Sequence, residues 1–91
     1  MSDTNYDSAG IKSSVLNFVI DSSFGDKEKI DETTFLFREG YFDSMGFVSL
    51  IAFLEEKFSI QTADTDLVEE NFETVNAITD FVQKKLTIKS N

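Results

Sequence analysis

Ser44 is the residue of this chain whose position best suits covalent chemistry. Its hydroxyl stands at the start of the strongest helical pattern, directly after Asp43 and before Met45. Asp43 or Ser44 is the expected N-cap of this helix, and a serine in that position is ordinarily a cap, because its side-chain oxygen can accept a hydrogen bond from a free backbone N–H. The alternative is a serine modified by a phosphate-bearing group. A phosphodiester there would meet free N–H groups and the positive end of the helix dipole, worth about 0.3–1 kcal/mol at an exposed site.

The composition excludes most other chemistry. The 91 residues include no cysteine and no histidine. Thiolate and imidazole sites for zinc, copper or iron–sulfur clusters therefore cannot form, and neither can Cys–His or Ser–His catalytic pairs. Seventeen acidic against eight basic side chains give a formal charge of −9. That charge opposes binding to nucleic acid and to anionic membrane surfaces, so we expect neither as a partner.

Other metal-binding, nucleotide-binding and catalytic motifs are either absent or have the wrong spacing. The segment that begins at Asp64 resembles the start of a calcium loop, but Val68 and Glu69 occupy the positions of the third ligand and the glycine. Neither G-x-x-x-x-G-K-[ST] nor G-x-G-x-x-G occurs. Glu55 and Glu56 are adjacent, so on a helix they point about 100° apart and cannot form a catalytic carboxylate pair. We therefore expect no enzyme activity of the chain's own and no metal site.

Helical periodicity accounts for most of the chain. Apolar residues at helical spacing predict four helices, at about 8–22, 44–58, 66–71 and 74–87. No alternating pattern of useful length indicates a β-strand. We expect an all-α fold, a small four-helix bundle with a long first loop and a short third helix. Residues 8–87 should form a single domain, with flexible tails at 1–7 and 88–91.

The long loop before the second helix is not typical of a flexible segment. Residues 25–43 have no clear period, and Gly40 offers a turn position between apolar pairs. The loop contains several large apolar side chains that would be costly to leave in water, namely Phe35, Leu36, Phe37, Tyr41 and Phe42. We therefore expect it to lie across the core.

The helix at 44–58 carries two apolar faces. The first, centred on Phe47, continues through Leu50 and Leu54 and is the expected core face. A second stripe of Met45, Val48 and Ala52 lies roughly 100–160° around the helix, beside Ser49 and Glu56. Either this helix is central and touches neighbours on two sides, or the stripe is an exposed docking strip.

At these residues the sequence resembles the acyl carrier protein family. The segment LFREGYFDSMGFVSLIAFLEEKF, at 36–58, is similar to the family's apolar loop, its Asp-Ser-Leu or Asp-Ser-Met signature and its amphipathic helix ending in Glu-Glu-x-Phe. A weaker resemblance extends over about residues 11–86. The resemblance to this family implies a four-helix bundle and a 4′-phosphopantetheine arm attached to Ser44 through a phosphodiester. Asp43 and Met45 match the residues that flank the attachment serine.

The resemblance also implies partners. A phosphopantetheinyl transferase would install the arm, and an adenylating ligase, an acyltransferase or a synthase would load or process an acyl or aminoacyl thioester. Gly46 and Ser49 stand where fatty-acid-synthesis carriers generally have acidic docking residues. The string Asp-Ser-Met-Gly is closer to D-alanyl carriers and discrete peptidyl-type carriers. This favours a specialised lipid or nonribosomal-type pathway.

Charge is distributed unevenly along the chain. Residues 44–60 hold two glutamates and one lysine, whereas residues 61–73 hold five acidic residues and no basic one. We expect a basic partner surface to meet that acidic segment, next to the apolar strip headed by Ser44. The expected partner-contacting residues are Met45, Phe47, Val48, Ser49, Ala52, Glu56, Glu69 and Glu70.

Two other functions stay open. An unmodified helical interaction module would dock through Met45, Val48 and Ala52 and would not need Ser44. An acidic nucleic-acid mimic would need charge spread regularly along one face, which the uneven distribution opposes.

The N-terminal MSDTNYDSAG has no signal-peptide pattern, and no apolar run approaches the roughly 18 residues of a membrane span. We therefore expect a cytoplasmic monomer without membrane insertion.

Overall fold

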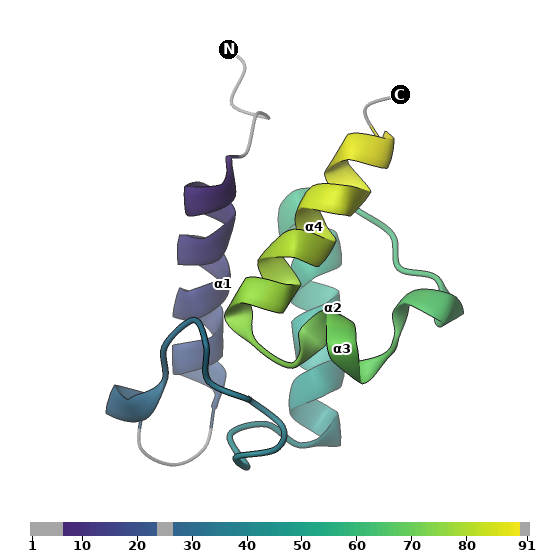
Figure 1. Cartoon of the computed structure of the whole chain (residues 1–91). Helices are drawn as coiled ribbons and strands as arrows, with labels where there is room; N and C mark the ends of the chain where they lie inside the picture. The colour runs from purple at the N-terminus through teal and green to yellow at the C-terminus, as the bar shows by residue number, and fades with distance from the viewer. Residues whose placement is uncertain (1–6, 24–26, 90–91) are drawn as a thin grey trace.

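Helices in the order α1, α2, α3 and α4 make up the framework of the chain (Figure 1). A computed structural model describes residues 7–23 and 27–89. The helices are α1 Ser8–Ser22, α2 Ser44–Phe58, α3 Glu69–Phe72 and α4 Val75–Lys89, with 3₁₀ turns η1 at Lys27–Lys29 and η2 at Asp64–Asp66. Within the described residues there is no β-strand. The expected all-α, four-helix fold is confirmed.

Aspartate side chains set the starts of α1 and α2. Asp7 accepts a hydrogen bond from the Gly10 N–H at 2.8 Å, and Asp43 accepts one from the Gly46 N–H at 3.0 Å. Each carboxylate satisfies a first-turn N–H that has no partner within its helix. At the other end of α1, Lys27 Nζ donates to the Ile20 and Ser23 carbonyls at 2.6 and 3.0 Å. Because these local signals coincide with the apolar periodicity, the bounds of both helices match the prediction.

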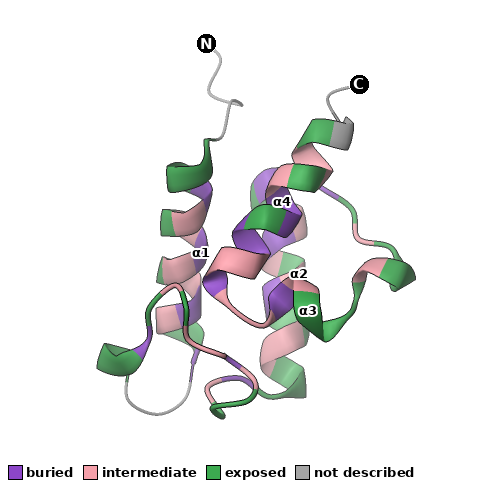
Figure 2. Cartoon of the chain, in the orientation of Figure 1, coloured by how far each residue is buried: buried purple, intermediate pink, exposed green. Residues whose placement is uncertain are grey.

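The core lies where α1, α2 and α4 face one another, and α1 packs mainly along α4. Figure 2 shows buried segments on the facing sides of α1 and α4. Every helix contributes buried apolar residues: Ile11, Val15 and Val19 from α1, Leu50, Leu54 and Phe58 from α2, Phe72 from α3, and Val75, Ile78, Phe81 and Val82 from α4. No helix among the described residues combines the length and apolar character needed to cross a bilayer.

The loop between α1 and α2 lies across the core, as predicted. Its Ile30, Leu36 and Phe42 side chains are buried. Its backbone is also tied to the start of α4, because Leu36 N–H donates to the Glu73 carbonyl at 2.9 Å and Asn76 N–H donates to the Glu32 carbonyl at 3.0 Å. These bonds satisfy polar groups in the interior and fix the path of the loop.

A tight reversal brings this loop to the start of α2. The N–H groups of Tyr41 and Phe42 both donate to the Leu36 carbonyl, at 2.9 and 3.1 Å. Gly40 makes the reversal possible with a φ of +85°, a conformation that L side chains rarely adopt. The expected turn at Gly40 is therefore confirmed.

The third helix differs in detail from the prediction of a helix at 66–71. The chain forms η2 at Asp64–Asp66 and a separate α3 at Glu69–Phe72, with Leu67 and Val68 outside both. The physical reason is the Asp66 side chain, which accepts the Ala63 N–H at 2.8 Å and closes a tight turn. Val68 is then extended, with φ −117° and ψ 150°, so a helix can begin only after it.

The last helix also differs slightly from its predicted range of 74–87. It begins one residue later, at Val75, where the Thr74 hydroxyl accepts the Ala77 N–H at 3.0 Å. It continues to Lys89, two residues further than expected. Of the two expected flexible tails, residues 1–6 and 90–91 lie outside the described residues, and Asp7 is the N-cap of α1.

Candidate functional site

Ser44 is the first residue of α2 and is exposed. It lies at the end of the bundle where the long loop joins α2 (Figure 1). The two N-terminal interactions of this helix both come from Asp43, whose side chain accepts the Gly46 N–H and whose carbonyl accepts the Phe47 N–H at 2.9 Å. Asp43 is therefore the N-cap, and the Ser44 hydroxyl faces solvent without serving that role.

Close packing between the loop and the first turn of α2 positions Ser44. A Cβ at Gly46 would lie 3.0 Å from Cδ2 of the Phe42 ring, tighter than most such contacts in proteins. Phe42 itself is only 4% exposed. Glycine at this position thus lets the buried ring rest on the helix backbone, and the loop and helix hold each other in place.

The second apolar stripe of α2 is exposed. Met45 is 73% and Val48 63% exposed, and Ala52 is also exposed. Ser49 and Glu56, predicted to lie beside the stripe, are exposed as well. Of the two interpretations, contact with a second neighbour within the chain is therefore wrong. The stripe is an apolar strip open to solvent, beginning one residue after Ser44.

Phe47 differs from the other predicted partner-contacting residues because it is half buried. Its ring meets the Phe37 ring edge-to-face at 5.7 Å and the Phe72 ring at 5.4 Å, both measured between centroids. The structure thus places Phe47 between the loop, α2 and α3, apart from the exposed strip. Its main contacts are within the bundle.

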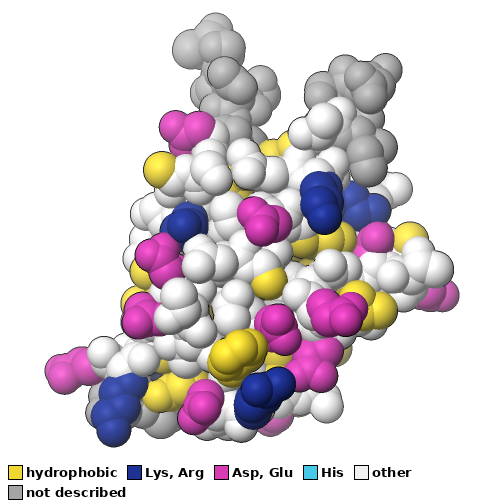
Figure 3. Space-filling model, viewed as in Figure 1, with side chains coloured by type: hydrophobic (Ala, Val, Ile, Leu, Met, Phe, Trp, Pro, Cys, Tyr) yellow, Lys and Arg dark blue, Asp and Glu magenta, His cyan; other side chains and the backbone are white. Residues whose placement is uncertain are grey.

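Leu67 and Val68 are exposed apolar residues that the sequence pattern did not reveal as surface. They are 40% and 42% exposed and directly precede the exposed Glu69 and Glu70. An apolar pair among acids is typical of the buried face of a short helix, and the turn at Asp66 is what holds the pair outside. Figure 3 shows acidic and apolar side chains next to one another over the region of α3.

Asp66 ties this acidic segment to α4. Its carboxylate accepts the Ala63 N–H and pairs with Lys85, while the Asn71 amide donates to the Asp66 carbonyl at 2.7 Å. The Ala63 N–H and then the Lys85 ammonium hold the pKa of the Asp66 carboxyl below its ordinary value, because both favour the charged form. The η2 turn is therefore fixed by an ion pair from a distant part of the chain.

Glu55 has a structural role at the end of α2. Its carboxylate accepts the Thr62 hydroxyl at 2.7 Å and the Thr62 N–H at 3.0 Å. These two donors hold the pKa of Glu55 below its ordinary value. The neighbouring Glu56 is exposed, so the two glutamates have different surroundings and do not face each other as an acid–base pair would.

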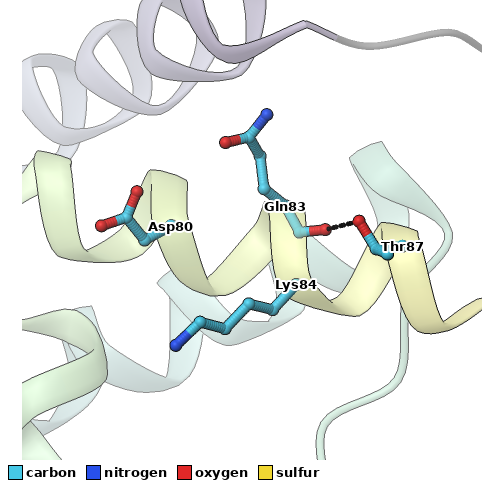
Figure 4. Close-up of a pocket in the computed structure, with 4 residues that line it drawn as sticks. All are labelled: Asp80, Gln83, Lys84 and Thr87. Atoms are coloured by element: carbon cyan, nitrogen blue, oxygen red, sulfur yellow. Dashed lines mark hydrogen bonds between the residues drawn. The ribbon is translucent and has the colours of Figure 1, made fainter.

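A depression of about 520 Å³ lies on α4, lined by Asp80, Gln83, Lys84 and Thr87 (Figure 4). Its four side chains come from one helix and point in different directions, so they do not converge on a common point (Figure 4). It is on the C-terminal part of α4, away from the end of the bundle that holds Ser44 (Figure 1). Among the described residues, no group of three acidic side chains is arranged to hold a metal ion.

The bundle, with its long first loop and short third helix, has the architecture of a carrier domain. The profile of the family described as "Phosphopantetheine attachment site" matches residues 19–82, which is more than half of the chain. The chain is also 35% identical over 48 residues to a D-alanyl carrier protein from Abiotrophia defectiva. That match covers 53% of this chain and 61% of the relative, so it spans less than two thirds of the relative's length. The chain belongs to the acyl carrier protein family, whose members carry covalent 4′-phosphopantetheine.

The start of α2 fits such a group. The Ser44 hydroxyl is exposed, and the first-turn N–H groups not used by Asp43 lack partners within the helix. The helix is 15 residues long, so the positive end of its dipole lies at this terminus. A phosphodiester on Ser44 would meet donors and positive potential without moving any packed side chain.

The capping geometry leads to a first prediction. Asp43→Ala should lower the free energy of unfolding by about 0.5–2 kcal/mol, because it removes the N-cap of α2. Ser44→Ala should change it by less than about 0.5 kcal/mol, because the exposed hydroxyl is not the cap. Urea unfolding followed by circular dichroism measures both. Equal losses in the two variants would show that Ser44 takes part in capping.

The Asp66 network leads to a second prediction, on pH. A carboxylate whose pKa is lowered by folding stabilises the fold above its unfolded pKa, and that contribution is lost as the pH falls through the folded pKa. Asp66→Asn should therefore lower the urea midpoint at pH 7, and the difference from wild type should vanish well below about pH 4. Asp64→Asn, in the same turn but exposed, is the matched control and should change the midpoint little. A loss in Asp66→Asn that stays constant down to pH 2 would contradict the ionic origin.

Proposed function

We propose that this protein is a discrete carrier in which Ser44 bears 4′-phosphopantetheine and holds an acyl or aminoacyl group as a thioester. The observation that carries this proposal is the capping of α2 by Asp43. It leaves the Ser44 hydroxyl exposed at a helix N-terminus, inside the segment that matches the family. When bound, the group supplies a thiol at the end of a flexible arm, and this thiol holds the cargo.

The chain's own residues anchor and present that arm. Asp43 fixes the first turn, and the packing of Phe42 on Gly46 holds this turn against the loop. The chain contains no cysteine that could exchange with the thioester. In this proposal the protein positions the arm and its cargo, and separate enzymes catalyse the reactions.

The exposed strip beside Ser44 is the proposed docking surface. It comprises Met45, Val48, Ser49, Ala52 and Glu56, and we add Leu67 and Val68, which are exposed next to Glu69 and Glu70. An apolar centre bordered by acids fits partner enzymes with an apolar patch and a basic rim. A phosphopantetheinyl transferase installs the arm. The similarity to a D-alanyl carrier protein supports loading by an adenylating ligase in a specialised lipid or nonribosomal-type pathway.

Attachment is tested by intact mass. Incubation of the protein with coenzyme A and a broad-specificity phosphopantetheinyl transferase should raise the wild-type mass by one phosphopantetheine. Ser44→Ala should show no gain. Ser13→Ala, which removes an exposed hydroxyl on α1 outside the docking surface, is the matched control and should be modified like wild type. A wild-type protein without mass gain would refute the proposal.

Docking is tested by loading of the modified protein with D-alanine by a D-alanine-adenylating ligase. Val48→Glu and the double reversal Glu69→Lys with Glu70→Lys should each lower kcat/KM about three- to tenfold, and the effect of the charge reversal should shrink at high salt. Reversal of Asp21 and Asp80, exposed on α1 and α4, is the control and should have little effect. Equal losses from both reversals would contradict docking at α3.

A second function, docking without modification, would use the same strip. The exposure of Met45 and Val48 favours it as the alternative, because such patches mark interaction surfaces. It predicts that Ser44→Ala has no effect on function while Val48→Glu abolishes partner binding. The intact-mass experiment on Ser44 therefore separates the two.

A further inference from the structure

A continuous series of phenylalanine rings fills the bundle beside Ser44. The ring of Phe37 meets those of Phe42 and Phe47 at 5.8 and 5.7 Å. The series continues from Phe47 to Phe72 at 5.4 Å, and from Phe72 to Phe81 at 4.9 Å. All four contacts are edge-to-face, and they join the loop, α2, α3 and α4.

Phe47 is the ring in this series that lies closest to Ser44 along α2. The two residues are three apart in the helix, so their side chains share one face. Ser44 is exposed, whereas Phe47 is half buried and its ring contacts those of Phe37 and Phe72, so burial increases along this face from Ser44 to Phe47. A group that hangs from Ser44 and turns inward along this face meets Phe47 first.

The first turn of α2 is also tightly packed where it meets Phe42. The buried Phe42 ring rests on Gly46 so tightly that a Cβ there would lie 3.0 Å from it. The backbone of Phe42 is fixed in turn by its hydrogen bond to the Leu36 carbonyl. Burial of the ring and this backbone bond together oppose movement of Phe42.

This arrangement matters for the cargo of a carrier. A long alkyl chain leaves water readily, and the nearest apolar volume is the core of the carrier itself. To enter here, the chain would have to displace Phe47, which contacts Phe37 and Phe72 at once. Displacing Phe47 would break both of these edge-to-face contacts, which hold the loop and α3 against α2.

We infer that Phe47 is a specificity-determining residue that closes the bundle beside Ser44. The protein thereby carries acyl groups that are short or polar enough to stay outside the core, and it does not store long alkyl chains. This inference rests on the proposed attachment at Ser44 and names the class of cargo held there.

The test compares forms of the protein that differ only in chain length. A broad-specificity phosphopantetheinyl transferase attaches the acyl-phosphopantetheine part of acetyl-, butyryl- or octanoyl-coenzyme A to Ser44. This gives three acylated proteins, each verified by intact mass. In wild type the urea unfolding midpoint should be the same for all three. In Phe47→Ala the midpoint should rise from acetyl to octanoyl, because the vacated volume accepts the longer chain.

Phe53→Ala is the matched control. Phe53 lies on the same helix, nine residues from Ser44, and its ring stacks on Phe18 at 4.3 Å. Its loss should lower all three midpoints equally. Phe47→Leu, a smaller truncation, serves if Phe47→Ala does not fold, and it should show the same rise with chain length.

The possible outcomes distinguish failure of this inference from failure of the proposed attachment at Ser44, on which it rests. A wild-type protein that gains no mass refutes attachment, and the inference falls with it. A wild-type protein that is acylated and stabilised by octanoyl refutes the closed bundle alone. Folded, acylated Phe47 variants with no dependence on chain length would show that another residue closes the bundle.

Discussion

The position of Ser44 depends on how the chain reverses around Leu36. The side chain of Leu36 is fully buried, its N–H donates to the Glu73 carbonyl, and its own carbonyl accepts two N–H groups of the loop. One residue thus joins the long loop to the α3–α4 junction and turns the loop back just before α2. Buried backbone groups are costly to leave unpaired, so these bonds leave the loop little freedom. The place where α2 begins, and hence the exposure of Ser44, follows from them.

Local signals made much of this fold predictable. The bounds of α1 and α2 follow from apolar periodicity and an Asp-Ser pair that can cap the helix, both of which are visible within about 15 residues of sequence. The segment around α3 could not be predicted in the same way. A helix of four residues has almost no period, and the turn that precedes it is held by Asp66 pairing with Lys85, nineteen positions away. The bond between Leu36 and Glu73 is equally invisible in a sequence pattern.

The candidate site could likewise be predicted only in part from the sequence. Periodicity separated the strip of Met45, Val48 and Ala52 from the core face of α2, because the two stripes point in different directions. It did not decide whether Asp43 or Ser44 caps the helix, since both residue types serve equally well there. The helix predicted at 66–71 includes Leu67 and Val68, whereas the Asp66 turn places both on the surface, outside any helix. The folded geometry decided both points, through the bond from Gly46 to Asp43 in the first case and through the turn at Asp66 in the second.

For a chain of this size, packed rings beside Ser44 are less costly than a permanent cavity for cargo. A domain of 91 residues has a small interior, and total stability is of the order of 5–15 kcal/mol. A permanent cavity of about 150 Å³, which would hold one benzene-sized group, would cost about 3–4 kcal/mol at about 24 cal/mol per Å³. That loss would remove a large part of the stability whenever the cargo was absent or short. In our inference Phe47 and its neighbouring rings lie where such a cavity would form, so the fold does not depend on cargo for its packing. The same contacts that hold α2 and α3 together therefore restrict what the carrier can store.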